Sequence, residues 1–405
     1  MSEDLPAFRR EVLAFLEGHA ERRPGVGDTV WGSGSDEIGL LDTYPDRETE
    51  ASALARARAW RRLVFDRGFG WLGGPTHLGG AGRDPALDEE YRLLERDFAV
   101  PDQQPFATGT RLVAPAILAH GSPELQERVV PGLFRGDLLA CQLLSEPEAG
   151  SDLAALRTRA VRDGDDWVVT GQKVWTSQAH LADLGQLLAR TDPDPASRHR
   201  GLTMFLLDMG SPGVTVRPLR QMTGEAHFNE VFLDGVRVPD ANRVGELGHG
   251  WHAVMATLSA ERAAVGAGAT NSAVDPVARL VELARHQGRL TDPTVRQGLA
   301  GIYTNAELRR LLVLRSEAAE AAGRPPGPEG SILKLLFADQ ARRCGELAAT
   351  LIGPALAADS GAWGLYAWGR WVCGAPMMRI AGGTDEIQRN VLAERMLGLP
   401  KEQSR

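Results

Sequence analysis

Two polar segments joined by an alternating stretch constrain this chain most. Residues 144–152 read LSEPEAGSD and residues 171–177 read GQKVWTS. Between them, residues 157–170 alternate around a DGDD turn, which predicts a β-hairpin. A Trp beside hydroxyl side chains suits a flat aromatic cofactor, because the indole can lie along the ring and hydroxyls can bond its heteroatoms. The alternative is an ordinary polar hairpin with a buried Trp.

In this order and spacing, the two segments resemble the flavin-binding signature of the acyl-CoA dehydrogenase family. The resemblance spans essentially the whole chain. It implies an α+β fold with an N-terminal all-α domain (1–138), a middle β-barrel-like domain that binds flavin and thioester (139–248), and a C-terminal four-helix bundle (249–405). The hydrophobic pattern agrees, since short apolar strands with period two occur only between helical stretches.

Composition excludes several other classes of protein. The 405 residues are 43% hydrophobic and carry a net charge of −8 with interspersed signs, which argues against nucleic-acid binding. Three widely spaced cysteines form no disulfide framework and favour a reducing cytoplasm. We expect no secretory signal, no membrane span and no metal-ligand cluster.

The family resemblance implies a reaction and a set of cofactor contacts. An acyl thioester would lose its α-proton to a carboxylate and its β-hydride to N5 of FAD, giving the 2-enoyl thioester. By resemblance, the FAD-binding residues are Gln142, Leu144, Ser145, Gly150, Ser151, Trp175, Thr176, Ser177, Thr384 and Glu386. Ser151 also matches a position that touches the thioester. Arg262 matches a residue at the CoA end, or else forms a structural ion pair.

The usual catalytic carboxylate of the family is missing from its common position. Residues 380–389, IAGGTDEIQR, resemble the motif I-Y-E-G-T-x-x-I-Q-R, with Gly382 in place of the Glu. Glycine cannot accept a proton, although its backbone N–H can still polarise the thioester carbonyl. Other members carry the base just before an Arg on the first helix of the C-terminal domain, so we expect Glu261 to be the base. The alternatives are a surface role for Glu261, or Glu386 as the base.

The absence of side chains at residue 382 also bears on the substrate. With Gly382 and Ala381 in place of Glu and Tyr, we expect a roomier pocket that suits branched, cyclic or otherwise bulky acyl groups. Neighbouring side chains could instead fill that volume, as close packing normally requires.

Two further segments depart from the family pattern. Residues 285–292, RHQGRLTD, lack the Phe-Gly of an R-x-x-F-G segment that usually reaches the neighbouring subunit's flavin pyrophosphate. Arg289 or Arg296 could serve there. Residues 349–355, ATLIGPA, lack the Gln and two glycines of a Q-x-x-G-G-x-G segment. These departures leave two assemblies open, a homo-oligomer (dimer or tetramer) or a heterotetramer with a related chain.

Three functions are consistent with these residues. The first is an acyl-CoA dehydrogenase that passes electrons to an electron-transferring flavoprotein. The second is a flavin oxidase or monooxygenase on the same fold, and the third is a flavin-poor partner subunit of a heteromeric dehydrogenase. The acyl carrier could be CoA or an acyl carrier protein.

Overall fold

A computed structural model describes residues 4–23, 31–40, 44, 46–255, 257–258, 275–321 and 327–401. It divides into two compact units. The first unit holds the N-terminal helices and the sheet. The second holds the C-terminal helices and also includes two segments from earlier in the chain, residues 29–43 and 221–225. Each unit is described below by itself.

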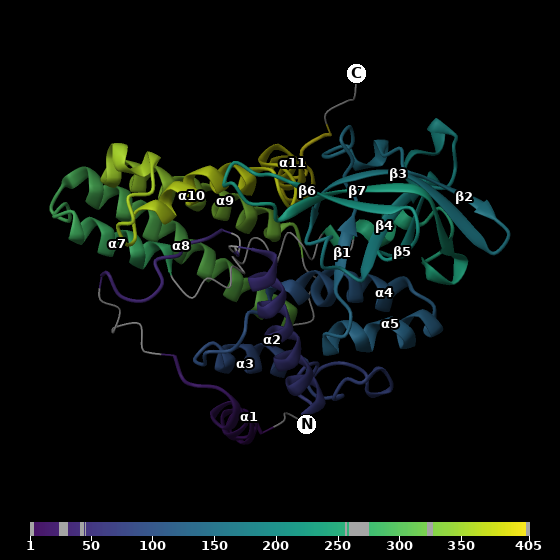
Figure 1. The fold of residues 1–405 in the computed structure, drawn as a ribbon, viewed down its shortest axis with the longest axis horizontal. Helices are drawn as coiled ribbons and strands as arrows, with labels where there is room; N and C mark the ends of the chain where they lie inside the picture. The colour runs from purple at the N-terminus through teal and green to yellow at the C-terminus, as the bar shows by residue number, and fades with distance from the viewer. Residues whose placement is uncertain are drawn as a thin grey trace. The chain divides into compact units, whose positions relative to one another are not determined.

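The N-terminal helices of the first unit begin at local sequence signals. They are α1 (Leu5–His19), α2 (Arg47–Asp66), α3 (Ala86–Glu95), α4 (Ala114–His120) and α5 (Pro123–Arg135). Asp4, Asp46 and Ser122 each accept a backbone N–H at a helix start, which satisfies a donor that the helix itself leaves unbonded. One core of this part packs α1 against α2 through Phe15 and Trp60. Helices α4 and α5 lie side by side beneath the sheet (Figure 1).

The sheet occupies the middle of the sequence. Its strands are β1 (Ala140–Leu143), β2 (Arg159–Asp163), β3 (Asp166–Ser177), β4 (Leu184–Arg190), β5 (Leu202–Asp208), β6 (Val214–Leu219), β7 (Phe228–Pro239) and β8 (Arg243–Val244). The order is β6-β7-β3-β2-β4-β5-β8, and β1 pairs with β4 in parallel. The predicted hairpin is confirmed as the antiparallel pair β2–β3, which turns between Asp163 and Asp166.

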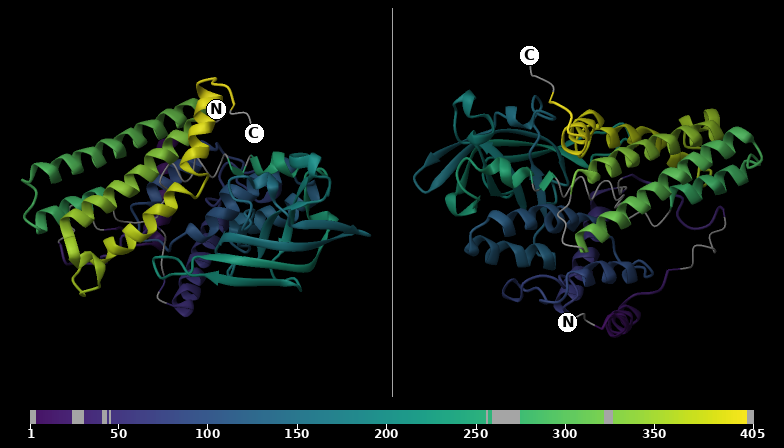
Figure 2. Two further views of the ribbon diagram at one scale, coloured as in Figure 1. Left: turned by 90° about the horizontal axis from the view of Figure 1, so that it is seen from above. Right: turned by 180° about the vertical axis from the view of Figure 1, so that it is seen from behind.

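The second unit is built from the C-terminal helices. They are α7 (Pro276–His286), α8 (Pro293–Ala321), α9 (Glu329–Ile352), α10 (Tyr366–Gly374) and α11 (Asp385–Val391). Helices α8 and α9 form a long antiparallel pair (Figure 2). Pro276 and Pro293 are each the first residue of a helix, where the missing N–H of proline costs nothing. The α+β fold class is as expected.

A segment from the beginning of the chain completes the core of the second unit. Ile38 and Leu40 are buried among residues of α7, α9 and α10. Trp31 stacks on His286 at a centroid distance of 4.6 Å, and the Trp363 indole donates to Gly34 O at 2.9 Å. We call residues 31–40 the strap. The Gly-, Asp- and Pro-rich composition of residues 24–46 predicts only a loop at this position.

The expected division into the domains 1–138, 139–248 and 249–405 stays a prediction. The first strand begins at Ala140, beside the boundary expected at residue 138.

Candidate flavin site

The two motif segments are bonded directly to each other in the first unit. The Lys173 ammonium donates to Leu144 O at 3.0 Å, and Val174 N donates to Ser145 O at 2.9 Å. Lys173 belongs to β3, whereas residues 144–152 follow β1, so these contacts join two separate strand ends. Sequence reasoning placed the two segments at one site, and the structure brings them together.

A buried ion pair fixes this junction. Lys173 Nζ lies 2.9 Å from Glu146 Oε1, with none of the Lys173 side chain and 8% of the Glu146 side chain exposed. Glu146 also accepts the backbone N–H groups of Arg157 at 2.6 Å and Thr158 at 2.9 Å. A Cβ at Gly171 would lie 2.7 Å from Thr158 Cα, so only glycine allows the strand this close.

Both members of this pair have shifted pKa values. Desolvation alone would raise the pKa of Glu146, but the Lys173 charge and the hydrogen bonds hold it below its ordinary value. Burial lowers the pKa of Lys173 to about 8, against the attraction of Glu146. The pair is therefore ionised at neutral pH and binds the two segments through a charge-assisted hydrogen bond.

The end of β3 has a strained backbone. Trp175 and Gln178 have φ of 60° and 54°, in the left-handed region that side chains other than glycine rarely adopt. The register between β3 and β7 shifts between Lys173 and Thr176, as in a β-bulge. As a result Trp175 is 61% exposed while Thr176 is 2% exposed. An outward-facing Trp on strained backbone is a common feature of binding sites.

The remaining expected flavin contacts of the first unit lie close to this junction in the chain. Gln142 is on β1, and its buried Nε2 has no hydrogen-bond partner among the described residues. Ser145 is half-buried, whereas Gly150 and Ser151 are exposed, and a Cβ at Gly150 would meet open space. An unsatisfied buried amide and exposed small residues fit a polar cofactor with a planar ring and a pyrophosphate.

The expected C-terminal contacts form a tight turn in the second unit. Gly382 and Gly383 have φ of 67° and 89°. The carboxamide of Gln388 donates to Gly382 O at 2.7 Å and to Gly383 O at 3.3 Å. Thr384 caps α11 by accepting Ile387 N at 3.3 Å. A side chain at residue 382 would need a left-handed backbone, which is a physical reason for glycine at this position.

The alternative base Glu386 lies in the first turn of α11 and is exposed. Hydrogen bonds from its own backbone N–H and from Thr384 lower the pKa of Glu386. A lower pKa makes a carboxylate a weaker base, so this environment disfavours proton abstraction by Glu386. The preferred base Glu261 and its neighbour Arg262 lie outside the described residues.

The two arginines expected at a neighbour's pyrophosphate differ in their surroundings. Arg289 donates to Asp292 Oδ2 at 2.6 Å and to Thr350 O at 2.9 Å. Arg296 is exposed in the first turn of α8. Because the guanidinium of Arg289 already has two partners, Arg296 is the better candidate of the two for an external phosphate.

Sequence reasoning missed the residues that support this site. Neither the Glu146–Lys173 pair nor the contact of Gln388 with the glycine turn was expected. One signal was present, because Lys173 continues the inward-facing register of Trp167 and Val169 on the same strand. A charge in an apolar register predicts a buried partner.

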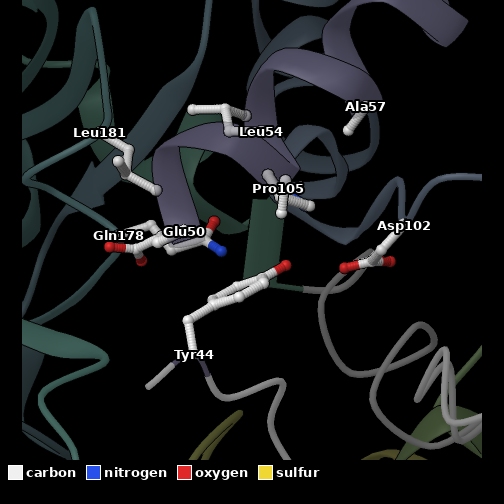
Figure 3. Close-up of a pocket in the computed structure, with 9 residues that line it drawn as sticks. Tyr44, Glu50, Leu54, Ala57, Asp102, Pro105, Gln178 and Leu181 are labelled. Carbon is white, nitrogen blue, oxygen red and sulfur yellow. The ribbon is translucent and has the colours of Figure 1, made fainter. Parts of the chain in front are cut away.

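A small pocket in the first unit lies between α2 and the end of β3 (Figure 3). Tyr44, Glu50, Asp102 and Gln178 are on its wall. The space inside, open solvent included, is about 250 Å³. Small-molecule sites usually enclose about 300–1,000 Å³. The pocket is therefore too small for a flavin or an acyl thioester.

Comparison with known proteins establishes the family. The model of the acyl-CoA dehydrogenase middle domain matches residues 141–236, and that of the acyl-CoA dehydrogenase C-terminal domain matches residues 248–397. The chain belongs to the acyl-CoA dehydrogenase family, whose members are flavin-dependent oxidoreductases acting on acyl-CoA.

Individual relatives cover nearly the whole chain. Acyl-CoA dehydrogenase IpdE1 of Mycobacterium tuberculosis is 37% identical over 99% of each chain. Acyl-CoA dehydrogenase FadE34 of the same organism is 40% identical over 97% of this chain, which spans about half (52%) of FadE34. Two solved structures are similar to this chain. The ChsE4-ChsE5 complex of M. tuberculosis is 30% identical, with a TM-score of 0.72 over 99% of each chain. The Tcur3481-Tcur3483 steroid ACAD is 27% identical, with a TM-score of 0.74 over 98% of each chain.

Within the described ranges, every helix is too short or too polar for a transmembrane span. The same residues contain no group of three or more His, Cys, Asp or Glu side chains placed to hold a metal ion.

Proposed function

We propose that this chain oxidises an acyl-CoA carrying a bulky or cyclic acyl group to the 2-enoyl-CoA, with FAD as cofactor and Glu261 as the base. The observation that carries the proposal is the bonded junction of the two flavin motifs, which presents Trp175 outward on a left-handed backbone. When bound, FAD would accept the β-hydride of the thioester at N5.

The chain's own residues supply the other requirements of the reaction. Trp175 offers an aromatic face and Ser145, Ser151 and Ser177 offer hydroxyls to the cofactor. The backbone N–H of Gly382 would polarise the thioester carbonyl as negative charge develops on it. The α-proton would pass to the carboxylate of Glu261, because no carboxylate stands at residue 382.

Two lines of support favour a bulky substrate. Residue 382 has no side chain and adopts a backbone that resists one. Relatives with ring-shaped substrates in their names include a steroid ACAD of 27% identity and a cyclohexane-1-carbonyl-CoA dehydrogenase from Geobacter metallireducens, 32% identical over 69% of this chain.

We also propose that the chain acts in a heteromer with a related chain. The ChsE4-ChsE5 and Tcur3481-Tcur3483 structures are named for two chains each. FadE34 is about twice as long as the part that matches here. The altered segments at residues 285–292 and 349–355 agree with this proposal, because a partner chain could supply the missing flavin contacts. Full FAD occupancy in a homotetramer of the purified chain would contradict it.

Anaerobic bleaching of the flavin by a panel of acyl thioesters tests the reaction. We expect ring-bearing acyl-CoA substrates to bleach it faster than short straight-chain ones. Glu261→Gln should keep its FAD and lose bleaching by a factor of about 10³ or more, whereas the matched charge removal Glu127→Gln, at an exposed position of α5, should bleach normally. Near-normal bleaching by Glu261→Gln would reject it as the base.

A further inference from the structure

A hydrogen-bonded array lies behind the strained end of β3. Asn229 on β7 is fully buried, and its Nδ2 donates to Thr176 O at 3.1 Å. The same Nδ2 lies 3.3 Å from His180 Nδ1. His180 Nε2 in turn lies 3.1 Å from Oε1 of Glu50, at the start of α2. A longer contact of 3.5 Å joins the same Nδ2 to His227 O. The array therefore runs from a helix carboxylate to the Thr176 carbonyl.

The hydrogen-bond partners determine which atoms of this array donate and which accept. Asn229 Nδ2 must be the amide nitrogen, because it faces the Thr176 carbonyl oxygen, which can only accept. We assign its second hydrogen to His180 Nδ1, which is nearer than His227 O, so that Nδ1 accepts and the Nε2 proton is donated to Glu50. The other oxygen of Glu50 pairs with Arg47 at 2.9 Å. Burial lowers the pKa of the neighbouring His227 to about 4, so His227 adds no positive charge at neutral pH.

The carbonyl that the array holds is at the centre of the strained backbone. Thr176 stands between Trp175 and Gln178, the two left-handed residues. Gln178 is held separately, by His227 O at 3.1 Å and by Gln104 at 3.1 Å. The β3–β7 ladder pairs Thr176 with Asn229 and Ser177 with Phe228 but skips residues 174 and 175, so the side-chain bond from Asn229 adds a second restraint beside Trp175. Its loss would leave the ladder alone to hold this carbonyl and would let the strained backbone at Trp175 relax further.

We propose that Asn229, His180 and Glu50 are positioning residues for the flavin: they fix the Thr176 carbonyl and thereby the angle at which Trp175 and Ser177 meet the isoalloxazine ring. The array contacts no cofactor itself and acts through the backbone of β3. This inference rests on the proposed flavin site.

Two substitutions at residue 180 separate the bonds of the imidazole. In His180→Asn the side-chain oxygen can replace Nδ1 as the acceptor for Asn229, whereas in His180→Gln the longer amide replaces Nε2 and keeps only the contact with Glu50. Asn229→Ala removes both donors. The matched control is Asn242→Ala, since Asn242 Nδ2 makes the same kind of bond, to Leu206 O at 3.0 Å, beyond the other end of β7.

The measurements are the FAD dissociation constant of the apoprotein, the visible flavin spectrum and the melting temperature of the apoprotein. We expect FAD affinity to fall about tenfold in Asn229→Ala and about threefold in His180→Gln, with shifted flavin bands, because a lost hydrogen bond changes a binding constant by such factors. His180→Asn keeps the acceptor for Asn229 but loses the bond to Glu50, so its loss of affinity should be smaller than that of His180→Gln. Asn242→Ala should stay within about twofold of wild type.

The outcomes are distinguishable. If the wild type binds no FAD, alone or with its partner chain, the proposed function fails. If the wild type binds FAD but Asn229→Ala matches its affinity and spectrum, only the positioning role is overturned, and a lower melting temperature would then mark the array as structural. Equal losses in His180→Asn and His180→Gln would also overturn it. If Asn229→Ala does not fold, the two variants of His180 decide.

Discussion

Each of the two units contains a buried lysine paired with a carboxylate. Lys173 on β3 lies 2.9 Å from Glu146, and Lys334 on α9 lies 3.2 Å from Asp385. Neither lysine side chain exposes any surface, and burial lowers the pKa of both. The first pair joins the two flavin-motif segments, and Asp385 of the second pair lies in the segment 380–389 that was expected at the flavin site.

The two ion pairs differ in the other hydrogen-bond partners of their carboxylates, Glu146 and Asp385. Glu146 accepts two backbone N–H groups, which belong to the main chain leading into β2 and cannot move away as a flexible side chain can. Asp385 instead accepts from Arg379 at 2.8 Å, and the Arg379 side chain is 51% exposed. The first pair is enclosed by main chain, whereas the second is shared with a residue that solvent reaches. Loss of the lysine should therefore cost more in the first unit.

The largest effect is expected for Lys173→Met. The change leaves the Glu146 carboxylate buried without a cation, which should lower the free energy of unfolding by about 3–5 kcal/mol. The two motif segments would also lose their junction, so FAD content should fall. Urea unfolding and flavin absorbance measure both effects. A fall in the free energy of unfolding of less than about 1 kcal/mol would show that burial of Glu146 among main-chain groups does not make the pair more important for stability.

A smaller effect is expected for Lys334→Met. Asp385 keeps its bond to Arg379, so the free energy of unfolding should fall by about 1–3 kcal/mol. The double variant with Arg379→Met tests the explanation, because removing both cations should cost more than the two single changes together. Purely additive losses in urea unfolding would contradict the idea of a shared carboxylate.

The pH dependence of Lys173→Met should differ in sign from that of the wild type. In the wild type the pKa of Glu146 is below its ordinary 4.5, so this group contributes stability that is lost as pH falls through and below 4.5. Without Lys173, burial would raise the pKa of Glu146, and the folded state would take up the proton first. The destabilisation of the variant should then shrink by about 1–2 kcal/mol between pH 7.5 and pH 5. Parallel urea series at both pH values provide the check; a constant difference would rule out a buried charge.

The smallest effect is expected for Arg157→Ala. The Arg157 side chain pairs with Glu148 at 2.7 Å, but both are largely exposed, at 79% and 70%. Its backbone N–H, which Glu146 accepts, remains after the change. The free energy of unfolding should change by less than about 0.5 kcal/mol. A larger loss would mean that the side chain, and not the backbone, supports Glu146.

Local pattern was enough to predict most of the fold. The hairpin expected around the DGDD turn is the pair β2–β3, and the strands lie between two sets of helices in the chain, as the hydrophobic pattern predicted. Such elements follow from periodicity within a short window. The inclusion of residues 29–43 and 221–225 in the second unit could not be predicted, because it depends on contacts between distant parts of the chain.

In the candidate flavin site, too, local motifs were predicted and contacts between distant residues were not. The motif residues around Ser145 and Trp175 were found from their order and spacing. Their supports were not found, because Lys173 meets Glu146 across 27 residues and Asn229 meets Thr176 across 53. A single sequence identifies the polar residues but does not show which of them are in contact in the folded protein. The role of Glu261 stays a prediction.

The strap constrains the order in which this protein can mature on the ribosome. Trp363 bonds to a strap residue 329 positions earlier in the chain. The strap leaves the ribosome early, but Ile38 and Leu40 have no core to enter until α7, α9 and α10 have been synthesised. The second unit must therefore complete its core after translation of the C-terminal third, and a fragment that begins at residue 258 would lack part of its own interior.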